Sequence, residues 1–233
     1  MSDFLFPGNC PVCGDEPYLS PHTYMCESCM DQITWIDGAR CKRCGVFMAG
    51  YGFEGLTCLK CRENDPCFLS GRCLFVLDRI GKKIIHEIKY QGVRDVLKDL
   101  PFWMERVPGV SDFIAGSYLV PVPLHRKKLM KRGFNQSQWI AQGLNKALEG
   151  KNVVADLLIR RRDTPSQTKF DRISRYENLN DAFAFKGEDS LDKKRPVTLV
   201  DDVYTTGATL DSCAQVLLEE GFDQISVFAL GHG

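Results

Sequence analysis

The sequence predicts an α/β protein with a parallel sheet and a small cysteine-rich module at its N-terminus. An apolar, β-branched run, Val197–Val200, is followed by a polar turn and an amphipathic helix, which is typical of a buried parallel strand. Other short apolar runs alternate with helical patterns from residue 73 onward. Ten of the 11 cysteines lie before residue 74. We therefore expect a module at residues 1–66 and a doubly wound domain at residues 67–233.

Composition and charge limit the classes of function. Hydrophobic residues make up 44% of the 233, which is enough for a packed core. The 30 basic and 30 acidic residues cancel, which disfavours an extended nucleic-acid coat but allows a local basic strip. No apolar run approaches the roughly 20 residues that a membrane helix needs. The N-terminus lacks the features of a signal peptide, so we expect a cytoplasmic protein with no membrane span.

Eight of the N-terminal cysteines form four C-x-x-C pairs. This spacing lets two thiolates point at one metal from a tight turn, and four thiolates make a structural zinc site that is closed to water. Gly14 and Gly45 directly follow two of the pairs, where the turn favours a positive φ. A disulfide framework is the alternative, which the missing signal peptide disfavours. We expect one or two structural zinc ions held by Cys10, Cys13, Cys26, Cys29, Cys41, Cys44, Cys58 and Cys61.

The spacing leaves the pairing of the ligands open. Neighbouring pairs would give two zinc ribbons in tandem and close shorter loops, whereas interleaved pairs would give a cross-brace. Cys67 and Cys73 have no partner at ligand spacing, so we expect ordinary thiols. Four cations flank the later pairs and are either a phosphate-facing patch or a solvated rim: Lys42, Arg43, Lys60 and Arg62.

The remaining elements follow from apolar periodicity and from breakers. Gly92 is expected to end the first helix, and prolines to end the second strand. A polar, turn-rich segment at 163–170 is expected to be a lid. In order, we expect a strand at 73–77, helices at 80–91 and 94–105, a strand at 118–123, a basic loop at 125–132, a helix at 137–148, a strand at 157–160, helical character at 171–179, a strand at 182–185, a surface loop at 187–195, and, after the central motif, a strand at 225–230.

The basic loop carries six cationic or imidazole side chains between His125 and Arg132. In a doubly wound sheet, ligands bind beyond the carboxyl ends of the strands, so this loop is expected beside the turn after Val200. A cationic loop there suits a pyrophosphate, and the donor fork of arginine suits it best, which singles out Arg126 and Arg132. The alternative is a solvated charge run.

The turn after Val200 indicates the chemistry of the site. A helix N-terminus presents unpaired N–H groups and the positive end of a dipole, which suits a phosphate. Gly207 would let the backbone approach the anion closely. Asp201 and Asp202 suit the vicinal hydroxyls of a ribose, directly or through Mg²⁺. Together these groups indicate a ribose 5-phosphate, and the alternative is a threonine that caps an ordinary helix.

The thirteen residues from Val197 to Thr209 closely resemble the phosphoribosyl-pyrophosphate (PRPP) motif of type I phosphoribosyltransferases. The resemblance implies a type I phosphoribosyltransferase-like sheet with helices on both faces. It implies that Asp201 and Asp202 are the catalytic acids that hold the ribose hydroxyls, with Mg²⁺ bound alongside PRPP. It also implies a loop that wraps the 5-phosphate, formed by Thr205, Thr206, Gly207, Ala208 and Thr209.

The whole chain resembles the ComF (ComFC/GntX) family. The paired C-x-x-C module, the segment from Pro121 to Gln136, the Asp-Asp-Val-Tyr-Thr-Thr-Gly turn, and Gln167 to Asn178 with Ala182-Phe183 carry the resemblance. That family joins a zinc-finger module to a phosphoribosyltransferase-like domain, and its members are associated with DNA uptake in natural transformation. The resemblance implies a bacterial cytoplasmic protein that acts on incoming single-stranded DNA.

Two functions are consistent with these features. The first is a competence factor that binds PRPP or a 5-phosphorylated nucleotide together with single-stranded DNA and other DNA-uptake proteins. Four aromatics of the module are candidates to stack on bases: Tyr24, Trp35, Tyr51 and Phe53. Several of them must instead fill the core of this small module, so we expect at most a minority to be exposed. The alternative is an active Mg²⁺-dependent phosphoribosyltransferase. The sequence shows no clear segment for choosing an acceptor base, and the Lys82–Gly92 helix is a candidate for that role.

Overall fold

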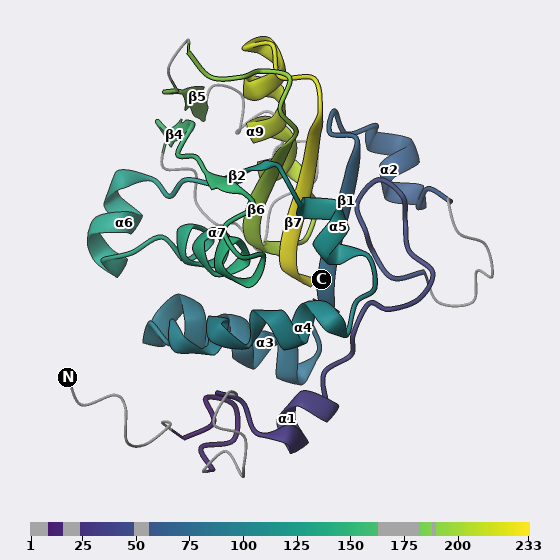
Figure 1. Ribbon diagram of the computed structural model, residues 1–233, viewed down its shortest axis with the longest axis vertical. Coiled ribbons are helices and arrows are strands. Elements are labelled where there is room, and N and C mark those ends of the chain that lie inside the picture. The colour runs from purple at the N-terminus through teal and green to yellow at the C-terminus, as the bar shows by residue number, and fades with distance from the viewer. Residues whose placement is uncertain (1–8, 16–23, 49–55, 163–181, 188–189) are drawn as a thin grey trace.

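A computed structural model describes residues 9–15, 24–48, 56–162, 182–187 and 190–233. Its centre is a five-stranded parallel sheet with the order β1-β7-β6-β2-β3 (Figure 1). The strands are β1 (Ser70–Val76), β2 (Tyr118–Pro121), β3 (Val153–Val154), β6 (Val197–Tyr204) and β7 (Ile225–His232). The α/β fold with a parallel sheet is therefore confirmed. The two longest strands, β6 and β7, are buried along most of their length.

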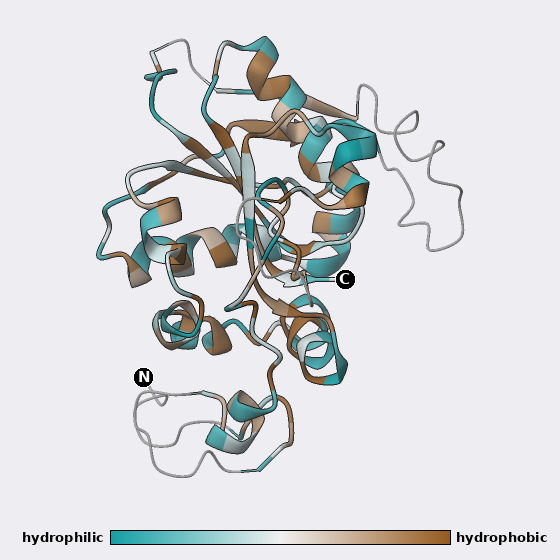
Figure 2. Cartoon of the chain, turned by 90° about the vertical axis from the view of Figure 1, so that its right-hand side faces the viewer, coloured by the Kyte–Doolittle hydropathy of each residue, from teal (hydrophilic) through white to brown (hydrophobic). Residues whose placement is uncertain are grey.

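Helices cover both faces of the sheet, and brown, apolar segments run through the strands and the helices around them (Figure 2). One face packs against the helices α3 (Arg79–His86), α4 (Leu100–Glu105) and α7 (Gln136–Ala147). The other packs against α9 (Ala208–Glu219) and a separate antiparallel pair, β4 (Leu158–Arg160) with β5 (Phe183–Phe185). The shorter helices are α1 (Glu27–Asp31), α2 (Leu59–Asn64), η1 (Glu87–Gln91), η2 (Asp95–Asp99), α5 (Val110–Ile114) and α6 (Arg126–Arg132).

The helix expected after β1 continues as a turn of π-helix. Asp78 caps α3, because its Oδ1 accepts hydrogen bonds from the backbone N–H of Ile80 and Gly81, both at 2.9 Å. The isoleucines at helical spacing are buried, as their periodicity predicted. The π-turn η1 then runs to Gly92, whose φ of 68° ends the helix. π-turns occur preferentially at functional sites, and this one carries Lys89 to the carboxyl end of β6.

The basic segment at 125–132 is a helix, which corrects the expected loop. The His125 side chain accepts a hydrogen bond from the Lys127 N–H at its start, and Gly133, with a φ of 84°, ends it. None of the seven residues of α6 is buried. Because the helix buries no face, its sequence shows no apolar periodicity from which a helix could be predicted.

Two further boundaries differ from expectation. Strand β6 continues to Tyr204, so the two aspartates lie within its end rather than after it. The expected helix at 94–105 is a 3₁₀ turn, η2, followed by α4, with Pro101 in the first turn of α4, where a missing N–H is tolerated. The short elements β3 and α5 were not expected. The expected lid at 163–170 and the helical segment at 171–179 lie outside the described residues.

The two halves of the N-terminal module pack on opposite faces of the sheet. Residues around the first four cysteines, such as Met25 and Ile33, join the apolar cluster of α3, α4 and α7. Asp99 is fully buried there and accepts hydrogen bonds from the N–H groups of Tyr24 and Met25 at 2.8–2.9 Å. Burial raises the pKa of Asp99 to about 6. The division of the chain at residues 66 and 67 stays a prediction.

The second half of the module lies directly against β1. Gly45 has a φ of 74°, and a Cβ built there would lie 2.6 Å from the Gly71 carbonyl oxygen. A Cβ on Gly71 would in turn lie 2.9 Å from the Arg43 oxygen. Both positions thus require glycine for the backbones to meet. The Arg43 side chain donates hydrogen bonds to the Phe68 carbonyl and to Asp65. This cation therefore helps to hold the module against the sheet domain and is not part of a free phosphate-facing patch.

Candidate functional site

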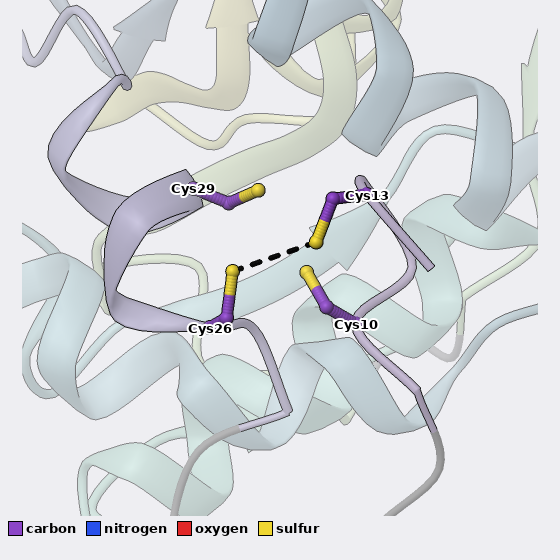
Figure 3. Close-up of side chains that lie close together, drawn as sticks. All are labelled: Cys10, Cys13, Cys26 and Cys29. Atoms are coloured by element: carbon purple, nitrogen blue, oxygen red, sulfur yellow. Dashed lines mark hydrogen bonds between the residues drawn. The ribbon is translucent and has the colours of Figure 1, made fainter. Parts of the chain in front are cut away.

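The first four cysteines converge on one point. The sulfur atoms of Cys10, Cys13, Cys26 and Cys29 all lie within 4.8 Å of one another (Figure 3). The Sγ atoms of Cys13 and Cys26 are 3.6 Å apart. A Zn–S bond of about 2.3 Å gives a tetrahedron whose edges are about 3.8 Å, so the spacing fits a metal and is far from the roughly 2.05 Å of a disulfide.

The other four ligands form a second group of the same kind. The sulfur atoms of Cys41, Cys44, Cys58 and Cys61 lie within 4.8 Å of one another, and those of Cys44 and Cys58 are 3.8 Å apart. The Cys58 N–H lies 3.2 Å from the Cys41 sulfur and donates to it. Such a backbone donor stabilises a thiolate, which is the form that binds zinc.

The structure therefore brings together all eight predicted metal ligands. Neighbouring pairs share a site, so the tandem arrangement is the one observed, and the cross-brace is not. None of the 11 cysteines forms a disulfide. Cys73 is buried in the sheet core, and burial raises its pKa to about 12, as expected for an inert thiol. The two groups of four cysteines support two structural zinc ions.

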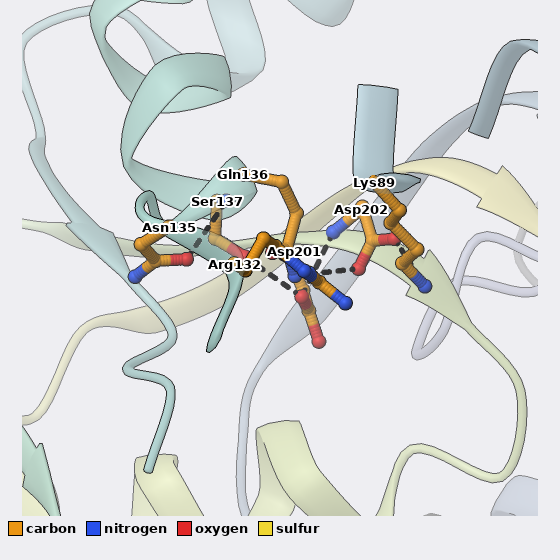
Figure 4. A network of polar contacts seen from close by, with 7 residues as sticks. All are labelled: Lys89, Arg132, Asn135, Gln136, Ser137, Asp201 and Asp202. Atoms are coloured by element: carbon orange, nitrogen blue, oxygen red, sulfur yellow. Dashed lines mark hydrogen bonds and ion pairs between the residues drawn. The ribbon is translucent and has the colours of Figure 1, made fainter. Parts of the chain in front are cut away.

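The acidic pair lies at the carboxyl end of β6 and is held from both sides (Figure 4). Asp201 accepts hydrogen bonds at 2.9 Å from the Ser137 hydroxyl of α7 and from the Asp202 N–H. Asp202 accepts a hydrogen bond at 3.4 Å from the Gln136 amide and forms an ion pair with Lys89 of η1. Sequence reasoning missed Lys89 as a partner, because its contact depends on the π-turn.

The carboxyl groups of Asp201 and Asp202 interact electrostatically. Burial, followed by the repulsion of Asp202, raises the pKa of Asp201 to about 8. At neutral pH Asp201 therefore carries a proton, and the Lys89 ammonium forms its ion pair with Asp202. The side chain of Asp202 is 5% exposed and that of Lys89 is 23% exposed. Such an arrangement can accept hydrogen bonds from a diol or bind a cation in place of Lys89.

The turn after β6 has the form expected for an anion site. Gly207 has a φ of 81° and directly precedes α9, whose twelve residues supply the helix dipole. A Cβ on Gly207 would clash with the Tyr204 hydroxyl, so only glycine fits between that ring and the loop. The hydroxyl of Thr206 accepts from the Ala208 N–H at 3.4 Å, while Thr205 is exposed. The turn thus begins a regular helix whose first N–H groups have no partner within the helix.

The basic helix α6 connects to the acidic pair through one residue. The Arg132 guanidinium donates a hydrogen bond to Gln136, which donates to Asp202. Arg126 lies in the first turn of α6, where no residue is buried. Of the two predicted pyrophosphate ligands, Arg132 therefore lies next to the site.

An exposed aromatic side chain on this side of the molecule was missed by sequence reasoning. Tyr90 is 65% exposed and lies between the His86 ring, at 5.1 Å, and the Arg132 guanidinium, at 5.4 Å from its centroid. Of the module aromatics named as candidates for base stacking, the two that the structure describes lie elsewhere. Trp35 packs edge-on against Phe75. Tyr24 lies under the Lys98 ammonium, while Tyr51 and Phe53 fall outside the described residues.

Within the residues that the structure describes, no helix is long and apolar enough to cross a membrane.

Comparison with known proteins agrees with this architecture. Residues 1–66 match the family model of the double zinc ribbon domain. The chain is 26% identical to competence protein F of Haemophilus influenzae over 219 residues, 88% of this chain and 89% of the relative. It is 26% identical to competence protein ComFC of Bacillus subtilis over 213 residues, 87% and 81% of the two chains. It is 28% identical to the DNA utilization protein YhgH of Escherichia coli over 233 residues, 96% of each chain.

The matches to these three relatives extend over both the cysteine-rich module and the sheet, so the relatives resemble the chain in both of its parts. The protein is a homologue of the competence proteins F and ComFC and of YhgH over most of its length, with a double zinc ribbon at its N-terminus, which confirms the predicted resemblance to the ComF family.

Proposed function

We propose that this protein is a cytoplasmic DNA-uptake factor of the ComF type, which binds PRPP or a 5-phosphorylated nucleotide and handles incoming single-stranded DNA. The observation that carries the proposal is the acidic pair at the end of β6, with Asp202 buried and Asp201 half-buried, beside a glycine-containing turn at the start of α9. The names of the relatives, competence protein F, competence protein ComFC and DNA utilization protein YhgH, support a role in DNA uptake.

In this proposal the ligand extends from the turn to the basic helix. The N–H groups and hydroxyls of residues 205–209 hold the 5-phosphate. Asp201 and Asp202 accept hydrogen bonds from the ribose hydroxyls in place of the Lys89 ammonium. Arg126 and Arg132 of α6 neutralise the pyrophosphate. Mg²⁺, where bound with PRPP, would supply further charge neutralisation of the pyrophosphate oxygens.

Calorimetry tests this assignment. PRPP with Mg²⁺ is titrated into the zinc-loaded protein and into the Asp201→Asn/Asp202→Asn variant. Asp223→Asn is the matched control, because Asp223 is an exposed aspartate on the surface before β7. Saturable heat in the parent and in the control, but not in the double variant, is expected. Equal heat in all three proteins would refute the assignment of the ligand to the acidic pair.

We propose that single-stranded DNA binds along α6 and Tyr90. Five of the seven residues of α6 are basic and none is buried, so the helix offers cations to the phosphates of a strand. Tyr90 adds an exposed ring on which a base can stack, next to Arg132. Lys89, the neighbour of Tyr90, pairs with Asp202, so a strand on this surface ends near the acidic pair.

Fluorescence anisotropy with labelled oligothymidylate separates stacking from charge. Tyr90→Ala should weaken binding by about 5- to 150-fold at every salt concentration, because it removes stacking. Lys127→Ala/Lys131→Ala should instead flatten the salt dependence, by about 0.7 in log–log slope for each phosphate that the variant no longer neutralises. Lys151→Ala, beyond the far end of α7, is the control and should leave both quantities unchanged. DNA affinity and salt dependence that are unchanged in both the Tyr90 variant and the α6 variant would refute this location.

The second candidate is an active phosphoribosyltransferase of unknown acceptor. It is favoured by the position of Arg132, which lies one hydrogen-bonded residue from Asp202 and so close to a leaving pyrophosphate. Pyrophosphate release from PRPP, measured with and without candidate acceptors, tests it. Acceptor-dependent release that disappears in the double asparagine variant would establish the enzyme. Binding without release over many hours would establish a binding protein.

A further inference from the structure

A cavity lies between the second zinc ribbon and the turn after β6. Its volume is about 350 Å³, within the range of roughly 300–1,000 Å³ that is typical of small-molecule sites. One wall comes from the module and includes Val46, Leu59 and Lys60, together with three ligands of the second zinc site, Cys44, Cys58 and Cys61. The opposite wall comes from the sheet domain and includes Tyr204 and His232.

The shape of the cavity is fixed by contacts on both sides. Tyr204 and His232 stack at 5.2 Å with an interplanar angle of 19°, so the sheet wall is a rigid aromatic surface. The module wall is held to β1 by the close backbone approach at Gly45. The residue that directly follows the module, Cys67, is held to α9, because its N–H donates to Asp211 at 2.8 Å. A preformed site of this kind loses little entropy on binding.

The lining indicates a flat, mostly apolar ligand. Leu59 lies at the rim in the first turn of α2 and is 62% exposed, an uncovered apolar surface that a ring would bury. Asn64 offers a donor and an acceptor side by side, and Lys60 offers a donor. An apolar slot with a few hydrogen-bonding groups at its edge suits a nucleobase.

The cavity adjoins the proposed phosphate site. Thr206 and Gly207 line the cavity and also form the turn before α9. The Tyr204 ring lies under Gly207 and also lines the cavity. A ring in the cavity would therefore lie near a phosphate on the turn, and the ribose of a nucleotide or of PRPP would have to span the space between them.

We propose that this cavity binds a nucleobase and that the second zinc ribbon forms one wall of that site. The proposal rests on the proposed function for the adjoining ribose 5-phosphate, while the base site itself can be tested without it. It replaces the expectation that the Lys82–Gly92 helix selects the base, because that helix is absent from the lining.

The experiment measures what a base adds to affinity. Ribose 5-phosphate, adenosine 5′-monophosphate and uridine 5′-monophosphate are titrated into the zinc-loaded protein by calorimetry. Leu59→Trp fills the cavity from its exposed rim. Leu69→Trp is the matched control, since Leu69 is 53% exposed and does not line the cavity. Two zinc ions per chain and an unchanged melting temperature show that each variant is folded.

At least one nucleotide is expected to bind about tenfold or more tightly than ribose 5-phosphate. Leu59→Trp should abolish that advantage and leave ribose 5-phosphate unaffected, while Leu69→Trp should retain it. If ribose 5-phosphate binds and neither base adds affinity, the cavity proposal is wrong and the proposed function stands.

Free adenine and uracil complete the test, each with and without PRPP and Mg²⁺. A free base that binds only with PRPP present indicates an acceptor, and a base that adds affinity only when joined to the sugar indicates a nucleotide. If ribose 5-phosphate fails to bind, the proposed function fails. The cavity proposal then stands only if a free base binds to the parent and not to Leu59→Trp, and is overturned otherwise.

Discussion

Replacement of Lys89 by methionine should expose how strongly the acidic pair depends on this one cation. The substitution keeps the length and apolar stem of the side chain and removes the charge. Asp202, which is 5% exposed, would then carry an uncompensated negative charge. Removal of one partner from a buried ion pair costs about 3–5 kcal/mol.

We expect a value at the lower end here, about 3 kcal/mol, because Lys89 is 23% exposed and water already screens part of the interaction. For a chain of this size, that loss lowers the melting temperature by about 6–12 °C. The loss should shrink between pH 8 and pH 5. At the lower pH Asp201, whose pKa is raised to about 8, is protonated, so it no longer adds a second negative charge beside Asp202.

Thermal unfolding of the zinc-loaded protein at pH 5 and pH 8 measures both effects. Lys82→Met is the control, because Lys82 is an exposed lysine on α3, the helix that η1 continues, and its replacement should change stability by no more than about 0.5 kcal/mol. The Lys89→Met/Asp202→Asn variant should recover much of the loss, since it removes the unpaired charge. A Lys89→Met protein as stable as its parent at pH 8 would refute the electrostatic account of the site.

Three further outcomes are expected. The folded protein raises the pKa of Asp201 from 3.8 to about 8, so this group costs stability as the pH rises from about 4 to about 8. Asp201→Asn should therefore raise the melting temperature more at pH 8 than at pH 5, and the reverse order would be inconsistent with that pKa. Gly45→Ala should destabilise far more than Gly14→Ala in thermal melts, because both have positive φ but only Gly45 meets a neighbouring backbone, at 2.6 Å. Chelation should release two zinc ions per chain and lower the melting temperature of the sheet domain too, since cysteines of the second site belong to the same apolar cluster as α9; an unchanged melt of that domain would contradict the packing.

Much of the architecture was predictable because its signals are local. The strand before Asp201 is a mostly apolar run rich in β-branched residues, and the isoleucines of α3 recur at helical spacing. The C-x-x-C pairs identified all eight metal ligands for the same reason. The sequence favoured tandem over interleaved pairing of these ligands but did not decide between them, because the difference in loop length between the two arrangements is small.

The parts that were missed depend on contacts between distant segments. Lys89 reaches Asp202 only because a π-turn extends α3, and no residue pattern predicts that turn. Helix α6 has no buried face, so its charged sequence was interpreted as a loop. The packing of the two zinc ribbons on opposite faces of the sheet, and the cavity beside the second, follow from how the module docks. Tyr90 was unremarkable in the sequence, because exposure is a property of the fold.

The most direct test of the account is a crystal structure of the zinc-loaded protein grown with PRPP and Mg²⁺. We expect the 5-phosphate on the N–H groups of residues 205–209, the ribose hydroxyls on Asp201 and Asp202, and the Lys89 ammonium displaced from Asp202. PRPP bound elsewhere, or an acidic pair still closed by Lys89 beside an ordered ligand, would contradict the central claim.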